Sequence, residues 1–486
     1  MKIKVIEINN YKAFYGKQKI NVGGKNLFIY GENGSGKSSL YYALKDFFQS
    51  SIEDIDLNEL ENIFIPDSKK GNSYIKVTFK PNSEGKNRNQ HFQLAAAIKN
   101  TDSGDDTSIR DANKLKSFLT YKHLLEIHHI QKGKQIDLFN LLVNGVLKHF
   151  RYTLTNGKEL GELWHVVETN IAKTTDISYN LTQKKKDVNA ALLTFNEAFS
   201  ELFNTDSPEY ILKHANPILD QFNHNLQIKL AYRQAISNSD YQAIENNHVQ
   251  IDLTYAGKKI AEPHLFLNEA RLSAIAISIY LGMIKRHIQG IPCKILFLDD
   301  IFIGLDIANR LPLLNILKSE FPDYQIFITT YDKPWYEYAK SYLEGAENWK
   351  TLEFYAQETK EGYEIPLIND DSDFLQKAEK YCNECDYKAA AVYTRSAFEK
   401  ILRKYCEDKK KKITFKAKLK DYTTEDFWGV IKEDVNSSIQ SEIEKYRALV
   451  LNAFSHYNTE RHEIKTELKN AMEAVKNLKN ELSKQS

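Results

Sequence analysis

The alternation of apolar and polar residues predicts β-strands in the first hundred residues. Residues 2–8 alternate, residues 19–22 form a shorter alternating run, and the apolar run 27–30 has the length of a buried strand. Residues 74–79 and 91–98 alternate on either side of a polar loop, so a hairpin of edge strands is expected there. The chain therefore starts with a sheet.

Apolar residues at three- and four-residue spacing predict helices in the middle of the chain. This spacing occurs over 160–172, 192–203 and 210–222, where Gly and Pro are sparse. A further helix is expected near 111–129. We interpret the segment 151–225 as a compact helical insertion in the form of a short hairpin.

The pattern returns to strands after the insertion and becomes helical again near the end. Strands are expected over 228–232, 249–255, 294–300, 324–332, 349–355 and 363–366, with an apolar helix over 265–281. The acidic, turn-rich run 369–373 is typical of a linker. The helices expected beyond it cover 374–383, 389–406, 438–454 and 462–482. The chain is therefore predicted to have an α/β fold followed by an all-α C-terminal domain.

Composition changes this picture little. A length of 486 residues leaves room for two or three domains. The net charge of +1 gives no global indication of a nucleic-acid partner, so a basic footprint would have to be local. No run of 18 apolar residues occurs, so no membrane contact is expected. The N-terminal residues lack a signal-peptide core, which favours a cytoplasmic location.

Two local patterns admit two interpretations each. Cys382 and Cys385 form a lone C-x-x-C, but a structural zinc site needs two further ligands, so incidental cysteines on a helix are the simpler interpretation. The lysine runs 184–186 and 409–412 could contact DNA or RNA phosphates. A solvated surface is the simpler interpretation of both runs.

The segment 31–38 fits G-x-x-x-x-G-K-[ST] and lies between the apolar run 27–30 and a helical stretch over 38–48. Strand, glycine-rich turn and helix in this order predict a phosphate loop. Its backbone N–H groups and helix N-terminus would face a triphosphate, with Lys37 on the β- and γ-phosphates and Ser38 on Mg²⁺. The predicted phosphate-binding residues are Gly31, Asn33, Gly34, Ser35, Gly36, Lys37, Ser38 and Ser39.

The strand at 294–300 ends in two carboxylates, which is the expected second half of a phosphate-loop ATPase. Asp299 would hold Mg²⁺, directly or through water. Asp300 would orient or deprotonate the attacking water.

Position alone suggests two further candidates. Lys12 contacts a phosphate or the adenine, or it is an exposed lysine at the end of a strand. Gln131 is a candidate sensor glutamine, a role that His128 or His129 could also fill.

The order of these segments resembles the ABC-type ATPases of the SMC and RecF group over residues 1 to about 360. Leu-Asn-Glu-Ala-Arg at 267–271 leads into an apolar helix just before the acidic strand, where that group has its signature segment. Gly-Leu-Asp at 304–306 resembles its D-loop. The resemblance implies an ABC-type head with an N-terminal lobe over 1–150, the insertion over 151–225 and a C-terminal lobe over 226–368, followed by the helical domain over 374–486.

The resemblance also implies a mechanism with ATP and Mg²⁺ as cofactors. Two heads form a homodimer around two nucleotides, and the signature residues Asn268, Glu269 and Ala270 of one protomer contact the γ-phosphate held by the other. Asp306 lies in the D-loop at the same interface. Because such a site is complete only in the dimer, ATP favours closure.

This sequence departs from the family pattern at three positions. Asn268 replaces the usual serine, although an amide can still donate to phosphate. Asp300 replaces the usual glutamate and is one methylene shorter. Tyr331 replaces the usual switch histidine, and a phenol, with an ordinary pKa of about 10, is a poor proton shuttle at neutral pH. We therefore expect catalysis to be slow, with ATP acting as a switch.

More narrowly, the chain resembles the ATPase subunits of bacterial anti-phage systems of the Septu-like (often retron-linked) and PARIS-like kinds. That resemblance implies an assembly beyond a dimer and a separate effector protein, commonly a nuclease. Two alternatives stay open. One is a DNA-repair ATPase of RecF type, and the other is a toxin in which the ATPase gates an RNase domain.

The C-terminal domain resembles HEPN-type helical domains. Asn452 and His456 match the polar residue and histidine of HEPN ribonucleases, but Leu451 lies where arginine belongs, and Arg447 lies one turn too early. We therefore expect a docking or oligomerisation module and no nuclease activity in this chain.

Overall fold

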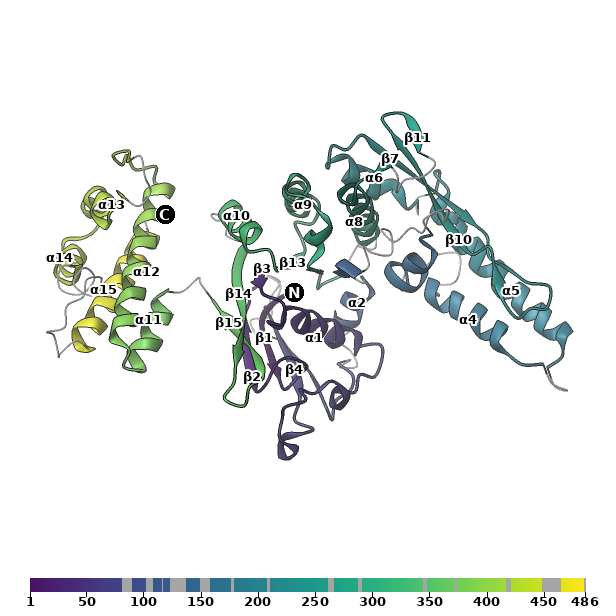
Figure 1. Cartoon of the computed structure of the whole chain (residues 1–486), viewed down its shortest axis with the longest axis horizontal. Helices are drawn as coiled ribbons and strands as arrows, with labels where there is room; N and C mark the ends of the chain where they lie inside the picture. The colour runs from purple at the N-terminus through teal and green to yellow at the C-terminus, as the bar shows by residue number, and fades with distance from the viewer. Residues whose placement is uncertain are drawn as a thin grey trace. The chain divides into compact units, whose positions relative to one another are not determined.

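The computed structural model divides the chain into two compact units, Met1–Asn369 and Asp370–Ser486 (Figure 1). It describes residues 1–80, 90–101, 108–115, 117–122, 137–148, 158–175, 179–207, 210–260, 266–286, 291–343, 348–370, 374–416, 421–447 and 465–484. Each unit is treated by itself below.

A six-stranded sheet forms the centre of the first unit. Its order is β15 (Glu364–Asn369), β14 (Trp349–Glu358), β3 (Asn26–Gly31), β13 (Gln325–Thr330), β12 (Ile295–Asp299) and β6 (Phe118–Thr120). All neighbours pair in parallel except β15, which is antiparallel to β14. The carboxyl ends of parallel strands meet at one edge, where α/β folds bind ligands. That edge receives the ends of β3, β12 and β13.

Side chains on the central strands alternate between two apolar cores. Leu27 and Ile29 of β3 belong to one core, and Phe28 and Tyr30 belong to the other. The first core is closed by α1 (Lys37–Gln49) and a four-stranded antiparallel sheet, and the second by α8 (Glu269–Arg286), α9 (Ile307–Glu320) and α10 (Lys333–Leu343) (Figure 1). The chain therefore has the mixed α/β fold that its pattern predicts.

The four-stranded sheet corrects one expectation. Its order is β2 (Lys17–Asn21), β1 (Lys2–Asn9), β4 (Tyr74–Lys80) and β5 (Gln90–Ala95). The hairpin of β4 and β5 forms as expected. Of these two strands only β5 lies at the edge of the sheet, because β4 also pairs with β1. The long pairing between β1 and β4 joins segments about 70 residues apart and has no local signal in the sequence.

The helix expected near 111–129 is wrong in its extent. Helix α2 (Ser108–Lys114) ends early, and β6 follows it as a strand beside β12, with Asp299 opposite Thr120. A three-residue strand is too short to give a period, so its tertiary pairing overrides the local helical pattern.

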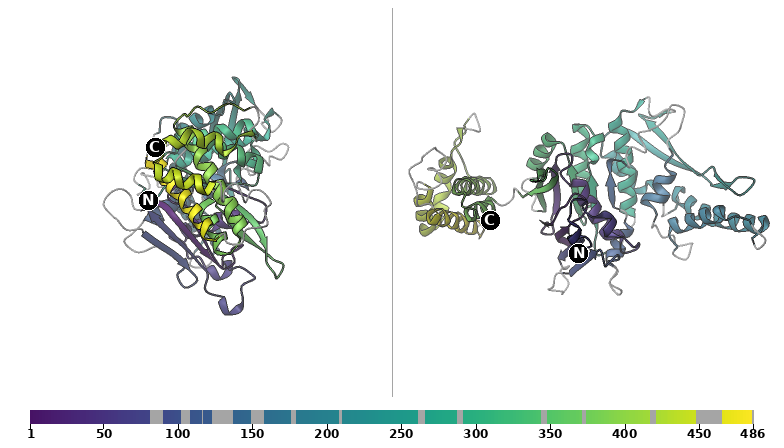
Figure 2. Two further views of the ribbon diagram at one scale, coloured as in Figure 1. Left: turned by 90° about the vertical axis from the view of Figure 1, so that its left-hand side faces the viewer. Right: turned by 60° about the horizontal axis from the view of Figure 1, so that its bottom comes forward.

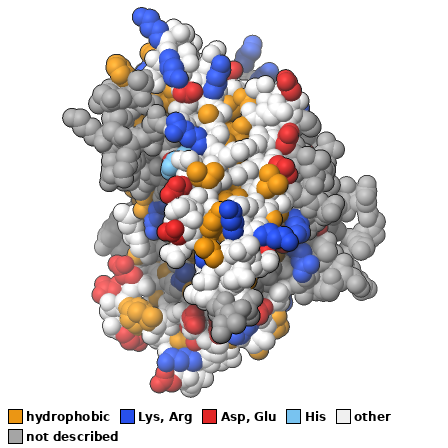
Figure 3. Space-filling model, turned by 90° about the vertical axis from the view of Figure 1, so that its right-hand side faces the viewer, with side chains coloured by type: hydrophobic (Ala, Val, Ile, Leu, Met, Phe, Trp, Pro, Cys, Tyr) orange, Lys and Arg blue, Asp and Glu red, His pale blue; other side chains and the backbone are white. Residues whose placement is uncertain are grey.

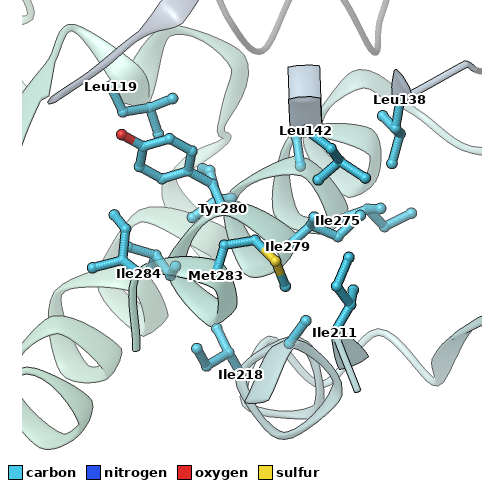
Figure 4. Packing of buried hydrophobic residues seen from close by; sticks show 14 of the residues in the cluster. Leu119, Leu138, Leu142, Ile211, Ile218, Ile275, Ile279, Tyr280, Met283 and Ile284 are labelled. Carbon is cyan, nitrogen blue, oxygen red and sulfur yellow. The ribbon is translucent and has the colours of Figure 1, made fainter. Parts of the chain in front are cut away.

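The segment 151–225 contributes helices to two places. Helices α4 (Leu160–Ala172) and α5 (Leu181–Ser200) pack side by side as a hairpin, visible in the right-hand view of Figure 2. Helix α6 (Leu212–Asp220) instead packs on α8, so closely that a Cβ on Gly282 would lie 2.7 Å from the backbone nitrogen of Ala215. Figure 4 shows the apolar packing around α8, with Ile218 of α6 facing Met283 of α8.

The hairpin also corrects the interpretation of the lysine run 184–186. Lys184 is buried, and its Nζ donates to the carbonyl oxygen of Lys173 at the end of α4 (2.8 Å), whereas Lys185 and Lys186 are exposed. On the face shown in Figure 3, basic and acidic side chains are interspersed among the described residues. The run is therefore in part a structural contact between two helices.

A three-stranded antiparallel sheet completes the first unit. Its order is β11 (Lys258–Ile260), β10 (His248–Tyr255) and β7 (Leu226–Arg233). The smaller elements among the described residues of the unit are β8 (Ile236–Ser237), β9 (Ile244–Glu245), short 3₁₀ turns (Leu57–Leu60, Asp67–Lys69, Glu201–Phe203, Ile301–Gly304) and a π-helical turn (Leu141–Val146).

The regular elements described in the second unit are all helices. They are α11 (Phe374–Asn383), α12 (Tyr387–Asp408), α13 (Thr424–Ile431), α14 (Ser437–Tyr446) and α15 (Lys465–Lys484). Helix α11 has the predicted limits, and α13, which is short, was not predicted. Within the described part of the chain, no cluster of three metal-ligating side chains occurs, so the C-x-x-C at Cys382 and Cys385 has no further ligand there.

Among the described residues, none of the helices combines the length and the apolar character that spanning a bilayer requires.

Candidate nucleotide site

The phosphate loop connects β3 to α1 and is closed too tightly for side chains at two glycines. A Cβ on Gly31 would lie 2.4 Å from Oγ of Ser35, and a Cβ on Gly36 would lie 2.5 Å from Cγ of Pro366. Gly36 also has φ of 94°, a left-handed conformation that favours glycine. No side chain caps the N-terminus of α1, so its N–H groups and positive end of the dipole face the loop.

Lys37 is almost fully buried, at 4% exposure, and folds back over the loop. Its Nζ donates to the carbonyl oxygens of Gly31 (2.6 Å) and Glu32 (3.0 Å), and it lies 4.0 Å from Oδ2 of Asp300. Burial lowers the pKa of Lys37, while the carboxylates around it oppose that shift. The loop therefore concentrates one positive charge where phosphates are expected.

Asp299 is brought to the loop from the other half of the sequence. Ser38 Oγ donates to its Oδ2 (3.2 Å), and Thr329 Oγ1 donates to its Oδ1 (2.6 Å). Burial raises the pKa of Asp299, and these two hydroxyls partly offset that shift. A serine hydroxyl and a carboxylate side by side are the hard oxygen ligands that Mg²⁺ prefers.

Asp300 adopts a left-handed backbone conformation, with φ of 52°, which is uncommon for a residue other than glycine. Its backbone N–H donates to Oγ1 of Thr329 (3.1 Å). Burial raises the pKa of Asp300 to about 6, Lys37 opposes the shift and Asp299 adds to it. Its Oδ1 is buried and has no hydrogen-bond partner among the described residues. A strained backbone and an unpaired carboxylate oxygen are typical of functional positions.

Tyr331 follows β13 and leaves 45% of its side chain exposed. The next residue, Asp332, accepts from Nη1 of Arg310 on α9 (2.5 Å), and Arg310 Nε donates to the carbonyl oxygen of Leu305 (2.8 Å). Arg310 therefore connects the segment 304–306, the predicted D-loop, to the segment that carries Tyr331.

The residues predicted to form the signature and the D-loop occupy helix N-termini. Oδ1 of Asn268 accepts from the backbone N–H of Arg271 (3.0 Å) at the start of α8. Oδ1 of Asp306 accepts from the backbone N–H (3.0 Å) and Nδ2 (2.7 Å) of Asn309, and so caps α9. Asn268 and Glu269 are exposed, and Ala270 is buried. Among the described residues, no hydrogen bond or ion pair joins these positions to the phosphate loop of the same chain.

The remaining predicted residues divide into described and undescribed ones. Lys12 Nζ lies 4.6 Å from the centre of the ring of Tyr42 on α1. Ser39, in the first turn of α1, accepts with its Oγ from the backbone N–H of Ala13 (3.3 Å). Asn33 and Gly34 are exposed on the loop. Gln131, with His128 and His129, lies outside the described residues, as does the HEPN-like segment 451–456.

Two residues near the acidic pair were missed. Thr329 bonds to both aspartates, and the only sequence signal for it was a hydroxyl near the end of a buried strand. Lys122 follows β6, and its charge lowers the pKa of Asp299. No local pattern could have found Lys122, because its proximity depends on the pairing of β6 with β12.

These residues fit Mg²⁺ and the phosphates of ATP. Glycines line the loop where a Cβ would collide, and the buried Oγ of Ser35 has no partner among the described residues. Ser38 and Asp299 offer adjacent oxygen ligands, and Lys37 offers the positive charge.

Replacing Thr329 with valine should weaken Mg²⁺ binding while preserving the fold. Valine has nearly the same shape but leaves Oδ1 of Asp299 without its donor. Loss of a partner that orients a metal ligand typically costs about 10- to 100-fold in affinity or activity. The measurement is ATP hydrolysis titrated with Mg²⁺. The matched control is Thr394→Val, at a fully buried threonine of α12. An unchanged Mg²⁺ dependence in Thr329→Val would contradict this role.

Replacing Asp300 with asparagine should stabilise the protein at neutral pH in the absence of Mg²⁺ and nucleotide. Because the folded-state pKa of about 6 lies above the unfolded value, ionisation of Asp300 lowers stability as pH rises from about 4 to 6. Asp300→Asn removes this cost, so it should gain up to about 3 kcal/mol at pH 7.5 and almost nothing at pH 4.

Urea unfolding at both pH values checks this, with Asp323→Asn as the control because that side chain is 78% exposed. A gain in Asp300→Asn that is the same at both pH values, or a loss at pH 7.5, would show that the charge is not the cause.

A family model matches most of this chain. The model of the RecF/RecN/SMC N-terminal domain matches residues 2–350. A search among curated proteins found no match. Solved SMC heads show a coarse likeness to this chain. An SMC head bound to the C-terminal winged-helix domain of ScpA is 11% identical, with a TM-score of 0.43, and the match covers 76% of this chain and 99% of that one.

Two further heads behave similarly. A head with an extended coiled coil, bound to the ScpA C-terminal domain from Pyrococcus furiosus, is 15% identical (TM-score 0.44, 79% of this chain, 99% of that one). The head from Thermotoga maritima is 13% identical (TM-score 0.35, 76% and 98%). The region that matches the family model covers well over half of the chain and includes the phosphate-loop segment and the acidic pair. The chain therefore belongs to the RecF/RecN/SMC N-terminal domain family and is an ATP-binding ATPase of that type.

Proposed function

We propose that this chain is an ABC-type ATPase that hydrolyses ATP slowly and forms an ATP-dependent homodimer. In bacterial defence it senses phage infection and scaffolds or controls a separate effector, a nuclease. The observation that carries the ATPase part is the contact between Ser38 and Asp299, 261 residues apart in sequence. Such a contact joins the two halves of a Mg²⁺–nucleotide site at the edge where the parallel strands end.

The chain's own residues have distinct roles in hydrolysis. Bound Mg²⁺–ATP would supply the γ-phosphorus that water attacks, with ADP as the leaving group. The loop N–H groups and Lys37 stabilise the negative charge, and Ser38 and Asp299 offer the metal ligands. Asp300 holds a carboxylate on the same edge, where it accepts the proton of the attacking water.

The second half of the site comes from a second copy of the chain. Large apolar side chains are exposed at the signature, after the acidic pair and at the switch: Phe266 (69%), Ile303 (44%), Ile307 (71%) and Tyr331 (45%). They flank Asn268, Glu269, Ala270 and Asp306, the predicted contacts to a partner's γ-phosphate. Exposed apolar side chains gathered around a half-built site favour a protein interface. A second copy is the occupant, because the phosphate loop and the signature complement each other.

The defence role rests on the resemblance to anti-phage ATPases and on the second, helical unit. Arg447, the arginine nearest to a HEPN motif, is held by Glu425 and Glu444 within that unit. These ion pairs favour a structural role for Arg447 over a catalytic one. The second unit therefore serves for docking or oligomerisation. A RecF-like repair ATPase is the second candidate; a contact with DNA or RNA that weakens steeply with salt would favour it.

We expect fewer than about one turnover per second, at the slow end of the enzyme range. Tyr331→His restores the usual switch residue at an exposed position and should raise the rate severalfold, because imidazole transfers protons near neutral pH. The measurement is steady-state phosphate release, with Tyr338→His on α10, also exposed, as the matched control. A wild-type rate well above one per second would show that Tyr331 is no impediment.

The experiment that tests the function is co-expression with the neighbouring genes, followed by a mass measurement with and without ATP. We expect a complex that contains a second protein and at least two copies of this chain, and we expect Lys37→Ala to abolish its ATP dependence. Homodimers alone, lost in Lys37→Ala, would contradict the effector and favour the repair ATPase. A monomer in saturating ATP would contradict the shared site.

A further inference from the structure

Beside the phosphate loop lies an aromatic cluster that the ATPase mechanism does not use. It consists of Tyr15, Phe64 and Tyr363. We propose that this cluster and Glu364 form the nucleoside end of the nucleotide site, with the aromatic rings stacking on a purine base and the carboxylate accepting from a ribose hydroxyl. This rests on the proposed function, because it extends the same site.

The register of the sheet places the β14–β15 hairpin beside the phosphate loop. Strand β14 runs parallel to β3, with Phe354 opposite Gly31, the last residue of β3. Because β14 continues to Glu358, it extends beyond the end of β3 on the side where the phosphate loop lies. The turn that follows is closed by a bond from the backbone N–H of Thr359 to the carbonyl oxygen of Tyr363 (2.8 Å). The hairpin tip therefore reaches past the strand end in an ordered conformation.

The hairpin packs against the loop itself. Pro366 lies so near Gly36 that a Cβ there would meet its Cγ at 2.5 Å, and a Cβ on Gly34 would lie 3.6 Å from Oε2 of Glu364. Glu364 is exposed, so its carboxylate is available to a ligand. A carboxylate beside the phosphates would repel them, but beside a sugar it is a good acceptor for a hydroxyl.

The aromatic side chains are fixed before any ligand arrives. The rings of Phe64 and Tyr363 stack with centroids 4.1 Å apart and planes 4° apart, and the Tyr15 ring lies 5.7 Å from Tyr363. Asn62 holds this arrangement: its Nδ2 donates to the carbonyl oxygen of Lys12 (2.7 Å), and its Oδ1 accepts from the backbone N–H of Phe64 (2.9 Å). Phe64 is nevertheless 45% exposed.

An exposed, preformed aromatic stack next to a phosphate site fits a nucleobase, because stacking of a base on an aromatic ring contributes substantially to the binding free energy. Alanine substitution of the ring measures that contribution. Purines offer the larger ring. Tyr363 and Glu364 also lie beyond residues 2–350, the part that matches the family model. Two of the four proposed contacts would thus come from a segment outside the shared family region, and Tyr15 and Phe64 come from within it.

The β14–β15 hairpin, which contributes Tyr363 and Glu364, also leads to the second unit. β15 begins at Glu364 and ends at Asn369, and the second unit begins at the next residue. A bound base would hold the hairpin tip and thereby the start of this connection.

The test measures equilibrium binding of Mg²⁺–ATP, Mg²⁺–CTP and tripolyphosphate, which has the phosphates but no nucleoside. We expect the wild type to prefer ATP over CTP. Phe64→Ala and Tyr363→Ala should each weaken ATP binding about tenfold and leave tripolyphosphate binding unchanged. Tyr363→Phe, which keeps the ring, should bind ATP like the wild type. Phe415→Ala is the control, at a phenylalanine 83% exposed in the second unit.

Hydrogen exchange gives a second readout that does not depend on catalysis. ATP should slow amide exchange over residues 359–369, and tripolyphosphate should not. An ATP affinity that changes less than twofold in both alanine variants, or a matching loss for tripolyphosphate, would overturn this inference. A wild type that binds neither ATP nor tripolyphosphate would overturn the proposed function itself, and this inference with it.

Discussion

The hydrogen bonds that Asp299 accepts from Ser38 and Thr329 are the constraint on which the site depends. A carboxylate that is only 3% exposed is costly unless donors compensate it. Those donors lie at the end of the phosphate loop and on β13, so the bonds form only when β3, β13 and β12 are adjacent and in register. The two apolar cores on either side of these strands provide that alignment, and the chemistry of the site follows from it.

The same edge concentrates groups that do not favour stability. Asp300 adopts a left-handed conformation and keeps a buried oxygen without a partner, and Lys37 is buried against backbone carbonyls. Such groups persist where the surrounding packing over-determines them, which is common at functional sites. Here the packing includes Pro366 against Gly36, so the outer hairpin of the sheet helps to close the loop.

Much of this could be predicted from sequence wherever the signal is local. The phosphate-loop segment has its own spacing, the acidic strand is a short apolar run, and α11 shows a clear helical period, with limits that the structure repeats. The mixed α/β fold and the membership of the SMC and RecF group were predicted correctly on that basis. What could not be predicted depends on pairing between distant segments. The strand β6, the role of Thr329 and the link from Arg310 to Asp332 arise only from such contacts.

The central claim is that each ATP site is shared between two copies of the chain. Mixing two inactive variants tests it most directly. Lys37→Ala removes the phosphate grip, and Asn268→Asp keeps the helix cap of α8 but places a negative charge against the partner's γ-phosphate. The account predicts that neither variant hydrolyses ATP alone and that their mixture does, because the loop of one and the signature of the other make one intact site. A mixture as inactive as its components, or an Asn268→Asp variant that is fully active alone, would contradict it.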